Sequence, residues 1–457
     1  MNHKKSKNIN TKNINTNITA KKLNKFSKKF NKIRTNKVLK NVNTKGYFKN
    51  LIIKSDYLQD KKKTFKNIID VETNITDQYN SGRCWIFAFL NIMRIPMIKK
   101  YKLKNFEFSQ NFLFFYDKLE KANYFLNFII KNKNTSLDDI KMIHMLENLT
   151  NDGGQWNMFV NLIEKYGIIP KTNMDDHFHS KNSNELENFF NNFLRTGAQK
   201  IRNAKFNELN KLKDDLLSNC YKILVLFLGE PPKKITWEYY KKGNKKDIYK
   251  TIENITPLEF YKKIVPYNVS DKICLINYPC KNIPFYKLYN TELAFNINDG
   301  ILENYINVPI DIMIDAVKKS IDSKEAVWTG IDTNKFISIN HGILDINAFN
   351  YKDIFGFDNI MEKCDSLNYR LSGPNHAVII KGYNFDKGKT EGFLIENSWG
   401  EDSGFKGNYY MNIDWFKNYT FIVVVDKKFV SKKVSSVLNK KPELFSYKSP
   451  FGGLLFK

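Results

Sequence analysis

The stretch from Gln78 to Trp85, Gln-Tyr-Asn-Ser-Gly-Arg-Cys-Trp, constrains the fold of this 457-residue chain more than any other feature. Ser81-Gly82 predicts a turn, and the residues from Trp85 to Met93 are apolar on nearly every side, as in a helix buried inside a domain. Cys84 then lies in the first turn of that helix, six positions after the Gln78 side-chain amide. The sequence therefore predicts a buried helix whose N-terminus presents a thiol next to a loop.

The composition is that of a globular protein with one large hydrophobic core or two modest ones, since 42% of the residues are hydrophobic and 14% are aromatic. The five cysteines are widely separated and show neither the short paired spacing of a zinc site nor a dense disulfide framework. This pattern predicts a reducing, cytoplasmic compartment. Four cysteines lack the neighbouring Gln and Trp and are interpreted as structural or incidental: Cys220, Cys274, Cys280 and Cys364.

The longest apolar run extends from Ile223 to Leu228, far short of the roughly 20 residues that span a bilayer. No apolar signal core follows the first methionine. We interpret the run as a buried strand, and the sequence predicts no membrane partner.

Positive charge is concentrated at the N-terminus. Residues 1–55 hold fifteen Lys and one Arg with no Asp or Glu, whereas the rest of the chain carries only about +10 of the total of +26. The segment Asn8–Asn17 cannot bury enough surface to offset the cost of ordering, so residues 1–55 are predicted to form a flexible basic extension. Weak nucleic-acid binding through counterion release is one interpretation of this extension. The other is a solvated tail, because a Lys-rich run without interleaved aromatic residues carries little specificity.

The remaining chain divides into segments of different periodicity. In residues 56–170, a long helix is predicted from Glu107–Gln110 to about Ile130, and another from about Gln155 to Tyr166, both packed around the Cys84 helix. Residues 171–299 are predicted to be a mainly helical insertion. Residues 300–430 predict a helix after Pro309 and then an antiparallel sheet, with candidate strands at 326–331, 377–383, 392–396, 408–411 and 420–425. Residues 431–457 are predicted to form a C-terminal arm, and the fold class is α+β.

The chemistry centres on the Cys84 thiol, which attacks a carbonyl only as the thiolate. An unperturbed cysteine has a pKa near about 8.5, and a helix N-terminus with an adjacent imidazolium is predicted to lower it. His376 precedes a predicted strand and is the candidate partner. Asn397 ends another strand and can hold the ring in one tautomer, while Trp399 can cover that bond from water.

Gln78 completes the predicted site, because its side-chain amide can donate to an oxyanion together with the Cys84 backbone N–H. Removing one such donor typically costs about 3 kcal/mol in the barrier. The pattern predicts nucleophilic hydrolysis of a peptide bond that uses no metal and no organic cofactor. Thiol alkylation is therefore expected to inhibit the protein and chelators are not.

These motifs resemble the bleomycin hydrolase and aminopeptidase C group of papain-like cysteine peptidases, and the resemblance covers essentially all of residues 66–457. It implies a papain-like fold with Cys84, His376 and Asn397 as the triad and Gln78 in the oxyanion hole. It also implies cytosolic aminopeptidases of broad specificity for peptide substrates, some of which hydrolyse bleomycin or homocysteine thiolactone and some of which bind nucleic acid. The insertion in this group assembles a hexameric ring, so a homo-oligomer is expected. The matching segments are 78, 82–85, 106–110, 114–118, 151–156, 164–167, 255–260, 325–328 and 396–401.

In this group the last residues lie in the non-primed side of the site, where the terminal carboxylate meets the substrate's α-ammonium. Lys457 resembles a removable last residue. Two departures affect the substrate side: Tyr447–Gly453 differs from the usual Trp-Asp-Pro-Met-Gly-Ala, and Gly373-Pro-Asn375 replaces Leu-Met-Thr before His376. Asn375 is thus expected on the substrate-facing lip. The alternatives are a papain-like endopeptidase, or a nucleic-acid-associated protein that uses residues 1–55.

Overall fold

The computed structural model describes residues 17–44, 46, 48–59, 64–71, 73–293 and 296–451. The chain divides into two compact units, one made of residues 1–54 and 349–358 and the other of residues 55–348 and 359–457. Most of the Asn8–Asn17 segment and all of residues 452–457, including Lys457, lie outside the described residues. The other residues of the predicted site all belong to the second unit.

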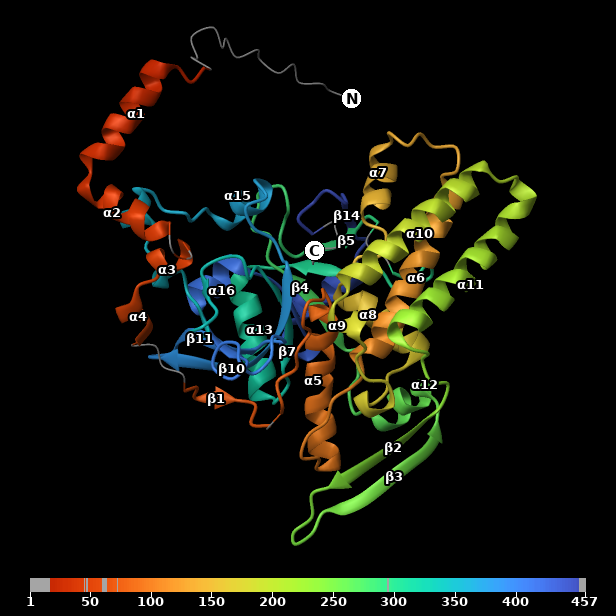
Figure 1. The fold of residues 1–457 in the computed structure, drawn as a ribbon. Helices are drawn as coiled ribbons and strands as arrows, with labels where there is room; N and C mark the ends of the chain where they lie inside the picture. Colours follow the sequence, from red (N-terminus) through yellow and green to blue (C-terminus); the bar gives the residue numbers. More distant parts are fainter. Residues whose placement is uncertain are drawn as a thin grey trace. The chain divides into compact units, whose positions relative to one another are not determined.

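The first unit contains helices within the basic extension. Thr19 caps the first of them by accepting a hydrogen bond from the backbone N–H of Lys22. No residue of α1 or α2 is buried, so core packing does not hold these two helices, and the flexibility of the extension stays a prediction. The helices of this unit are α1 (Ala20–Lys32), α2 (Arg34–Asn43), α3 (Phe48–Ile52) and α14 (Tyr351–Phe355) (Figure 1).

The helical half of the second unit is built around α5 (Cys84–Tyr101), which begins at the residue predicted. Its side chains from Cys84 to Ile95 are all buried, because neighbouring helices and the sheet cover it on every side. Phe89 of α5 stacks on Trp156 and Phe159 at the start of α8. The predicted neighbours of α5 are confirmed as α6 (Gln110–Lys131) and α8 (Trp156–Tyr166), and α7 (Ile140–Glu147) also belongs to this half (Figure 1). Helix α4 (Ser55–Gln59) lies instead against residues 346–348, and its Tyr57 hydroxyl donates to the Asp345 carboxylate at 2.9 Å.

One prediction is wrong: the run from Ile223 to Leu228 is not a strand but the end of α11 (Leu209–Leu228). Only every fourth residue of this helix is buried near its end, with Leu224 and Leu228 inside and Leu226 72% exposed. That is the stripe of a helix with one covered face, and a short apolar run alone does not separate the two possibilities. The other elements here are α9 (Phe178–Lys181), α10 (Asn184–Asn203), the hairpin of β2 (Ile235–Lys241) with β3 (Ile248–Ile255), and α12 (Pro257–Glu259) (Figure 1).

The other half of this unit is a mixed sheet of twelve strands among the described residues, in which the predicted antiparallel strands are confirmed. Its order is β14-β5-β6-β4-β13-β7-β10-β11-β12-β9-β8, with β1 also paired to β10. Strands β4 and β5 belong to this sheet, so residues 171–299 contribute to it as well as forming helices. The strands are β1 (Asn67–Ile68), β4 (Lys272–Ile276), β5 (Leu288–Thr291), β6 (Tyr305–Asn307), β7 (Val327–Ile331), β8 (Ile337–Ser338), β9 (Ile343–Leu344), β10 (His376–Asp386), β11 (Lys389–Glu396), β12 (Asn408–Asn412), β13 (Thr420–Asp426) and β14 (Glu443–Phe445).

Helices flank this sheet, and α13 packs against β13, β10 and β7. Its residues Met313, Val317 and Ile321 are fully buried at a spacing of four, as expected of a helix with one face on a sheet. Among the described residues, none of the helices is both long and apolar enough to cross a membrane. The helices in this part of the chain are α13 (Ile310–Asp322), α15 (Lys363–Asn368), α16 (Ile413–Tyr419) and α17 (Lys432–Ser435).

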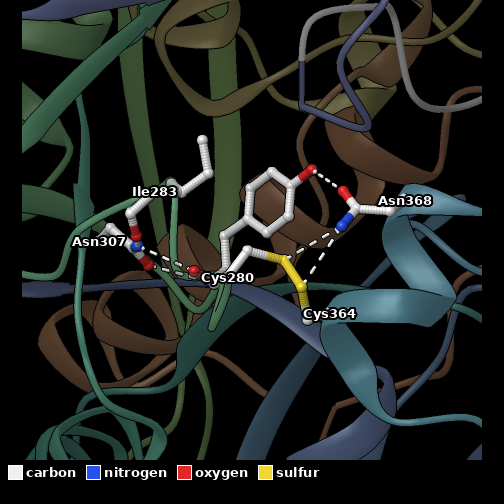
Figure 2. The surroundings of a disulfide bond; sticks show 6 residues. Cys280, Ile283, Asn307, Cys364 and Asn368 are labelled. Atoms are coloured by element: carbon white, nitrogen blue, oxygen red, sulfur yellow. Dashed lines mark hydrogen bonds between the residues drawn. A yellow bond between two sulfur atoms is a disulfide. The ribbon is translucent and has the colours of Figure 1, made fainter. Parts of the chain in front are cut away.

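Cys280 and Cys364 form a disulfide that ties the loop after β4 to α15 (Figure 2). The Asn368 amide donates to both sulfur atoms, and its oxygen accepts from the Tyr278 hydroxyl. These two cysteines are therefore structural, as the sequence interpretation allowed. A stable disulfide is uncommon in a reducing compartment, so this bond counts against the compartment inferred from cysteine spacing.

The described part of the C-terminal arm is fastened to the edge of the sheet. Strand β14 pairs in parallel with β5, which places Phe445 in a stack with Tyr289. Phe451 is fully buried and its ring lies 5.3 Å from that of Tyr278, next to the disulfide. The arm is thus held at Phe451, immediately before the residues that lie outside the described range.

Candidate active site

The loop that carries Cys84 is held by one buried carboxylate, that of Asp152. Its Oδ2 accepts from the Gly82 backbone N–H at 2.9 Å, and its backbone oxygen accepts from Trp85 Nε1 at 2.7 Å. A Cβ at position 82 would lie 2.7 Å from the Asp152 Cβ, so the close approach requires glycine there. Asp152 therefore fixes the chain on both sides of the thiol.

Asp152 remains ionised in spite of its burial. Desolvation raises the pKa of this carboxyl, but the Lys118 ammonium 2.6 Å away and the Ser183 and Gly82 donors outweigh it and lower the pKa to about 2. A permanent charge at this position gives the loop strong, charge-assisted hydrogen bonds.

Arg83, directly before the thiol, also has a buried ionic partner. Its Nη1 donates to the Asp176 carboxylate at 2.6 Å and its Nε donates to the Ser81 hydroxyl at 3.0 Å. Both side chains of the ion pair are almost completely inaccessible to solvent. The ion pair joins the start of α5 to the segment before α9, and so fixes the backbone next to Cys84.

The imidazole and the amide of the predicted triad meet through adjacent strands. His376 opens β10 opposite Ile331 of β7, and Asn397 directly follows the last residue of β11. His376 Nε2 lies 2.7 Å from Asn397 Oδ1, and both side chains are buried. Because the amide oxygen can only accept, Nε2 carries the proton in this pair and Nδ1 is left as the basic nitrogen.

The segment around Gln78 is joined to the segment around Asn397 by paired hydrogen bonds. The Gln78 backbone N–H donates to the Ser398 carbonyl at 2.9 Å, and the Ser398 hydroxyl donates to Gln78 Oε1 at 2.8 Å. Ser398 also donates its backbone N–H to Asn397 Oδ1 at 2.8 Å. A single serine thus couples the candidate oxyanion donor to the residue that orients the imidazole.

The Cys84 sulfur lies at the start of β10, beside the imidazole's own backbone. Backbone N–H groups of Ala377 and Trp85 hydrogen-bond to it and favour the thiolate, but burial dominates and raises the pKa of the Cys84 thiol to about 12. Burial likewise lowers the pKa of His376 to about 4, although the Asn397 bond raises it. The direction for the thiol is opposite to the one predicted from the sequence, because both side chains are buried and desolvation disfavours the charged form of each.

Of two further residues of the predicted site, Trp399 contacts the imidazole, whereas the side chain of Asn375 is bound elsewhere in the protein. The centre of the Trp399 ring lies 4.8 Å from that of the His376 ring, so the indole contacts the imidazole, and its role in covering the His376–Asn397 bond stays a prediction. The Asn375 amide is engaged within the protein instead: Nδ2 donates to Asp332 at 2.6 Å and Oδ1 accepts from the Thr333 N–H at 3.0 Å. Asn375 therefore shapes the lip through its backbone position, with its side chain directed to the loop after β7.

Below Asn397, the site is supported by a buried charge cluster. Glu396 accepts from Arg94 Nη2 at 2.7 Å and from Lys381 Nζ at 2.9 Å. Burial opposes the ionisation of Glu396, but these two cations outweigh it and lower the pKa of the carboxyl. The cluster links the middle of α5 to β10 and β11, and so joins the helical half to the sheet directly beneath the triad.

Sequence reasoning missed the roles of Asp152 and Ser398. Asp152 lies just before the helix predicted from about Gln155, and no local pattern shows that its carboxylate binds the Gly82 backbone N–H, 70 residues away. Ser398 stands between Asn397 and Trp399, and its position within that motif is the only sequence signal of its role. The Gln78–Ser398 bond spans 320 positions and exists only in the folded chain.

Removal of the Gln78 amide is expected to slow the reaction strongly. Its Nε2 donates to the Ser81 carbonyl at 2.6 Å, which orients the amide and leaves its second N–H for an oxyanion. We expect Gln78→Ala to lower kcat about 10²–10³-fold. Gln78→Glu fills the same space without an N–H donor and is expected to lose a similar factor, as measured by steady-state turnover of an aminoacyl-coumarin. A normal kcat in both variants would show that the oxyanion is held elsewhere.

Comparison with known proteins places this fold and site in one family. Residues 17–452 match the family model described as the Peptidase C1-like family. Bleomycin hydrolase of Mus musculus is 34% identical over 455 residues, covering 96% of this chain and 99% of the mouse protein. Aminopeptidase C of Listeria monocytogenes is 38% identical over 383 residues, covering 83% of this chain and 86% of the bacterial protein.

A solved structure agrees over the same extent. The crystal structure of PepW from Lactobacillus rhamnosis superimposes with a TM-score of 0.92 at 33% identity, covering 96% of this chain and 99% of that one. The chain therefore belongs to the Peptidase C1-like family, among the cysteine aminopeptidases related to bleomycin hydrolase and aminopeptidase C.

Proposed function

We propose that the protein removes N-terminal residues from peptides, with Cys84 as nucleophile, His376 as general base and acid, Asn397 as the residue that orients the imidazole, and Gln78 as an oxyanion donor. The observation that carries this proposal is the 2.7 Å bond between His376 Nε2 and Asn397 Oδ1, together with the hydrogen bond from the Ala377 backbone N–H, directly after His376, to the Cys84 sulfur. This bond leaves Nδ1 as the nitrogen that can exchange a proton with the thiol.

The reaction follows from these roles. The Cys84 sulfur attacks the first peptide carbonyl while His376 Nδ1 takes the thiol proton, and the Gln78 amide and the Cys84 backbone N–H stabilise the oxyanion. The imidazolium then protonates the departing amine as the C–N bond breaks. Water, deprotonated by the same imidazole, attacks the thioester and releases the N-terminal amino acid, which restores the thiol.

The protonation states bear on the first step. Burial raises the pKa of the Cys84 thiol and lowers the pKa of His376, so burial favours the uncharged form of each group taken separately. His376 Nδ1 is the nitrogen left to take the thiol proton when the sulfur attacks.

A cleft next to the nucleophile loop supports binding of an extended peptide. It is a cavity of about 630 Å³ beside Gly82, and Asp152, Asn151 and Glu187 lie along its wall. We place the N-terminal side of the substrate here. The last residues of the chain lie outside the described residues. By resemblance, the terminal carboxylate is expected to meet the substrate's α-ammonium, so that only the first residue is removed.

The test compares peptides with a free N-terminus and the same peptides N-acetylated, using the full chain and a variant that ends at Phe451. Ending the chain there removes the proposed carboxylate contact but keeps the buried Phe451 anchor, so the fold is retained. The full chain is expected to cleave only free peptides, and the shortened chain to cleave both. If the full chain cleaves acetylated peptides equally well, the endopeptidase alternative is correct.

The finer expectations on assembly and location remain part of this proposal. A homo-hexamer with sites facing an internal channel rests on the resemblance alone, and the mass of the particle in solution tests it. A cytoplasmic location rests on the resemblance and on the spacing of the cysteines, and the Cys280–Cys364 disulfide counts against it. Nucleic-acid binding by residues 1–55 rests on their charge alone, and a comparison of oligonucleotide and vesicle binding by the full-length protein tests it.

A further inference from the structure

Helix α1 separates apolar and basic side chains onto opposite faces. Leu23, Phe26 and Phe30 follow one another at helical spacing, and Ile33 at the C-cap continues the same stripe. The opposite face carries only lysines and asparagines. The basic residues of the helix are Lys21, Lys22, Lys25, Lys28, Lys29 and Lys32.

The apolar stripe of α1 is open to solvent. Leu23 is 54% exposed, Phe26 57%, Phe30 42% and Ile33 47%. Every residue of the helix is exposed except Lys22, which is half-buried. A helix of 13 residues with six like charges gains little from its own hydrogen bonds in water, so an external surface that covers this stripe would stabilise it substantially.

We infer that α1 docks on the surface of a membrane rich in anionic phospholipids, with its apolar stripe in the headgroup region and its lysines directed to lipid phosphates. The charge of residues 1–55 favours an anionic membrane as the partner, since they hold sixteen cationic side chains and no acidic one. Lysine stems lie along the apolar boundary while the ammonium groups stay hydrated, as amphipathic interfacial helices require.

The apolar stripe distinguishes this partner from nucleic acid. Phosphate backbones attract the lysines equally well, but they offer nothing that buries three consecutive exposed apolar side chains on one helical face. A bilayer interface offers both an anionic layer and an apolar layer at adjacent depths.

The prediction from the sequence that the protein has no membrane partner rested on the absence of a span. A helix that lies in the interface needs no span, so the finding that no described helix can cross a bilayer is compatible with surface binding. Docking through α1 is independent of the peptidase reaction, since α1 and the site residues belong to different units.

The experiment measures cosedimentation of the full-length protein with vesicles of phosphatidylcholine alone and with added phosphatidylserine. We expect binding only to the anionic vesicles, with an affinity that falls as salt is raised. The double variant F26S/F30S is expected to bind at least about tenfold more weakly, while F26L/F30L keeps the apolar stripe and binds as the original chain does. The matched control is F206S, which removes a ring that is 89% exposed in the other unit and should change nothing.

Three outcomes overturn the inference. The first is a full-length protein that binds neither kind of vesicle. The second is an affinity for a DNA or RNA oligonucleotide that exceeds the affinity for vesicles and is unchanged in F26S/F30S, which assigns the helix to nucleic acid. The third is a particle mass, without vesicles, that decreases in F26S/F30S, which assigns the stripe to a second copy of the chain. Peptidase turnover is measured on every variant to show that each is folded.

Discussion

Replacing Cys84 with alanine is expected to reduce kcat/KM toward an aminoacyl-coumarin by at least about 10⁴-fold. The substitution removes the sulfur that accepts from the Ala377 backbone N–H, directly after His376, and alanine is smaller than the buried cysteine that it replaces. The acyl-enzyme then cannot form, and the remaining oxyanion donors supply only a small residual rate. Steady-state turnover with purified protein, together with mass spectrometry for the acyl intermediate, measures the effect.

The control for this variant is Cys220→Ala, because Cys220 is also a buried free thiol but lies in α11. Its turnover should stay within about twofold of the original chain, since it touches none of the reacting groups. Turnover that persists in the Cys84→Ala protein would exclude the proposed mechanism. Alkylation of the original chain should abolish turnover. The same treatment should not change the residual turnover of the Cys84→Ala variant.

Replacing Arg94 with leucine is expected to lower the free energy of unfolding by about 3–5 kcal/mol. Arg94 is buried, and its loss leaves the Glu396 carboxylate in the interior with Lys381 as its remaining cation. The buried carboxylate then keeps only one of its two cations, so less of its desolvation cost is offset than in the original chain. Denaturant unfolding followed by circular dichroism measures the change in midpoint.

A matched control is Lys263→Met, which breaks an exposed ion pair with Glu259 one helical turn away. Exposed pairs of this kind contribute at most about 0.5 kcal/mol, so the midpoint should hardly move. A change in Arg94→Leu as small as in this control would mean that the cluster contributes little to stability.

The Arg94 effect is expected to depend on pH in a definite direction. The pKa of Glu396 is lowered below its ordinary value of 4.5, so the stability of the cluster is fully present above that pH. It is lost as the pH falls through the lower pKa of the folded state, when the carboxyl takes up a proton. The difference between Arg94→Leu and the original chain should therefore narrow in acid.

The sequence was sufficient for the elements that carry the chemistry. Hydrophobic periodicity and turn-forming residues located the helix at Cys84 and the strands that begin at His376 and end before Asn397, because each is a long, strongly patterned segment. They were insufficient for Ile223–Leu228, where six apolar residues fit a strand and a helix equally well until burial at every fourth position decides. They also did not separate α1 and α2 from a flexible tail, because the acid-free, Asn- and Lys-rich composition of residues 1–55 hid the short apolar stripe of α1.

What the sequence determined by itself is the set of reacting groups and the family to which they belong, because those depend on residue identity and local spacing. The tertiary structure alone decided how Ser398 couples Gln78 to Asn397, how Asp152 holds Gly82, and how burial sets the pKa of the thiol and the imidazole. These are contacts between distant parts of the chain among buried side chains. Hydrogen bonds across such distances and the local dielectric exist only once the two halves have packed together.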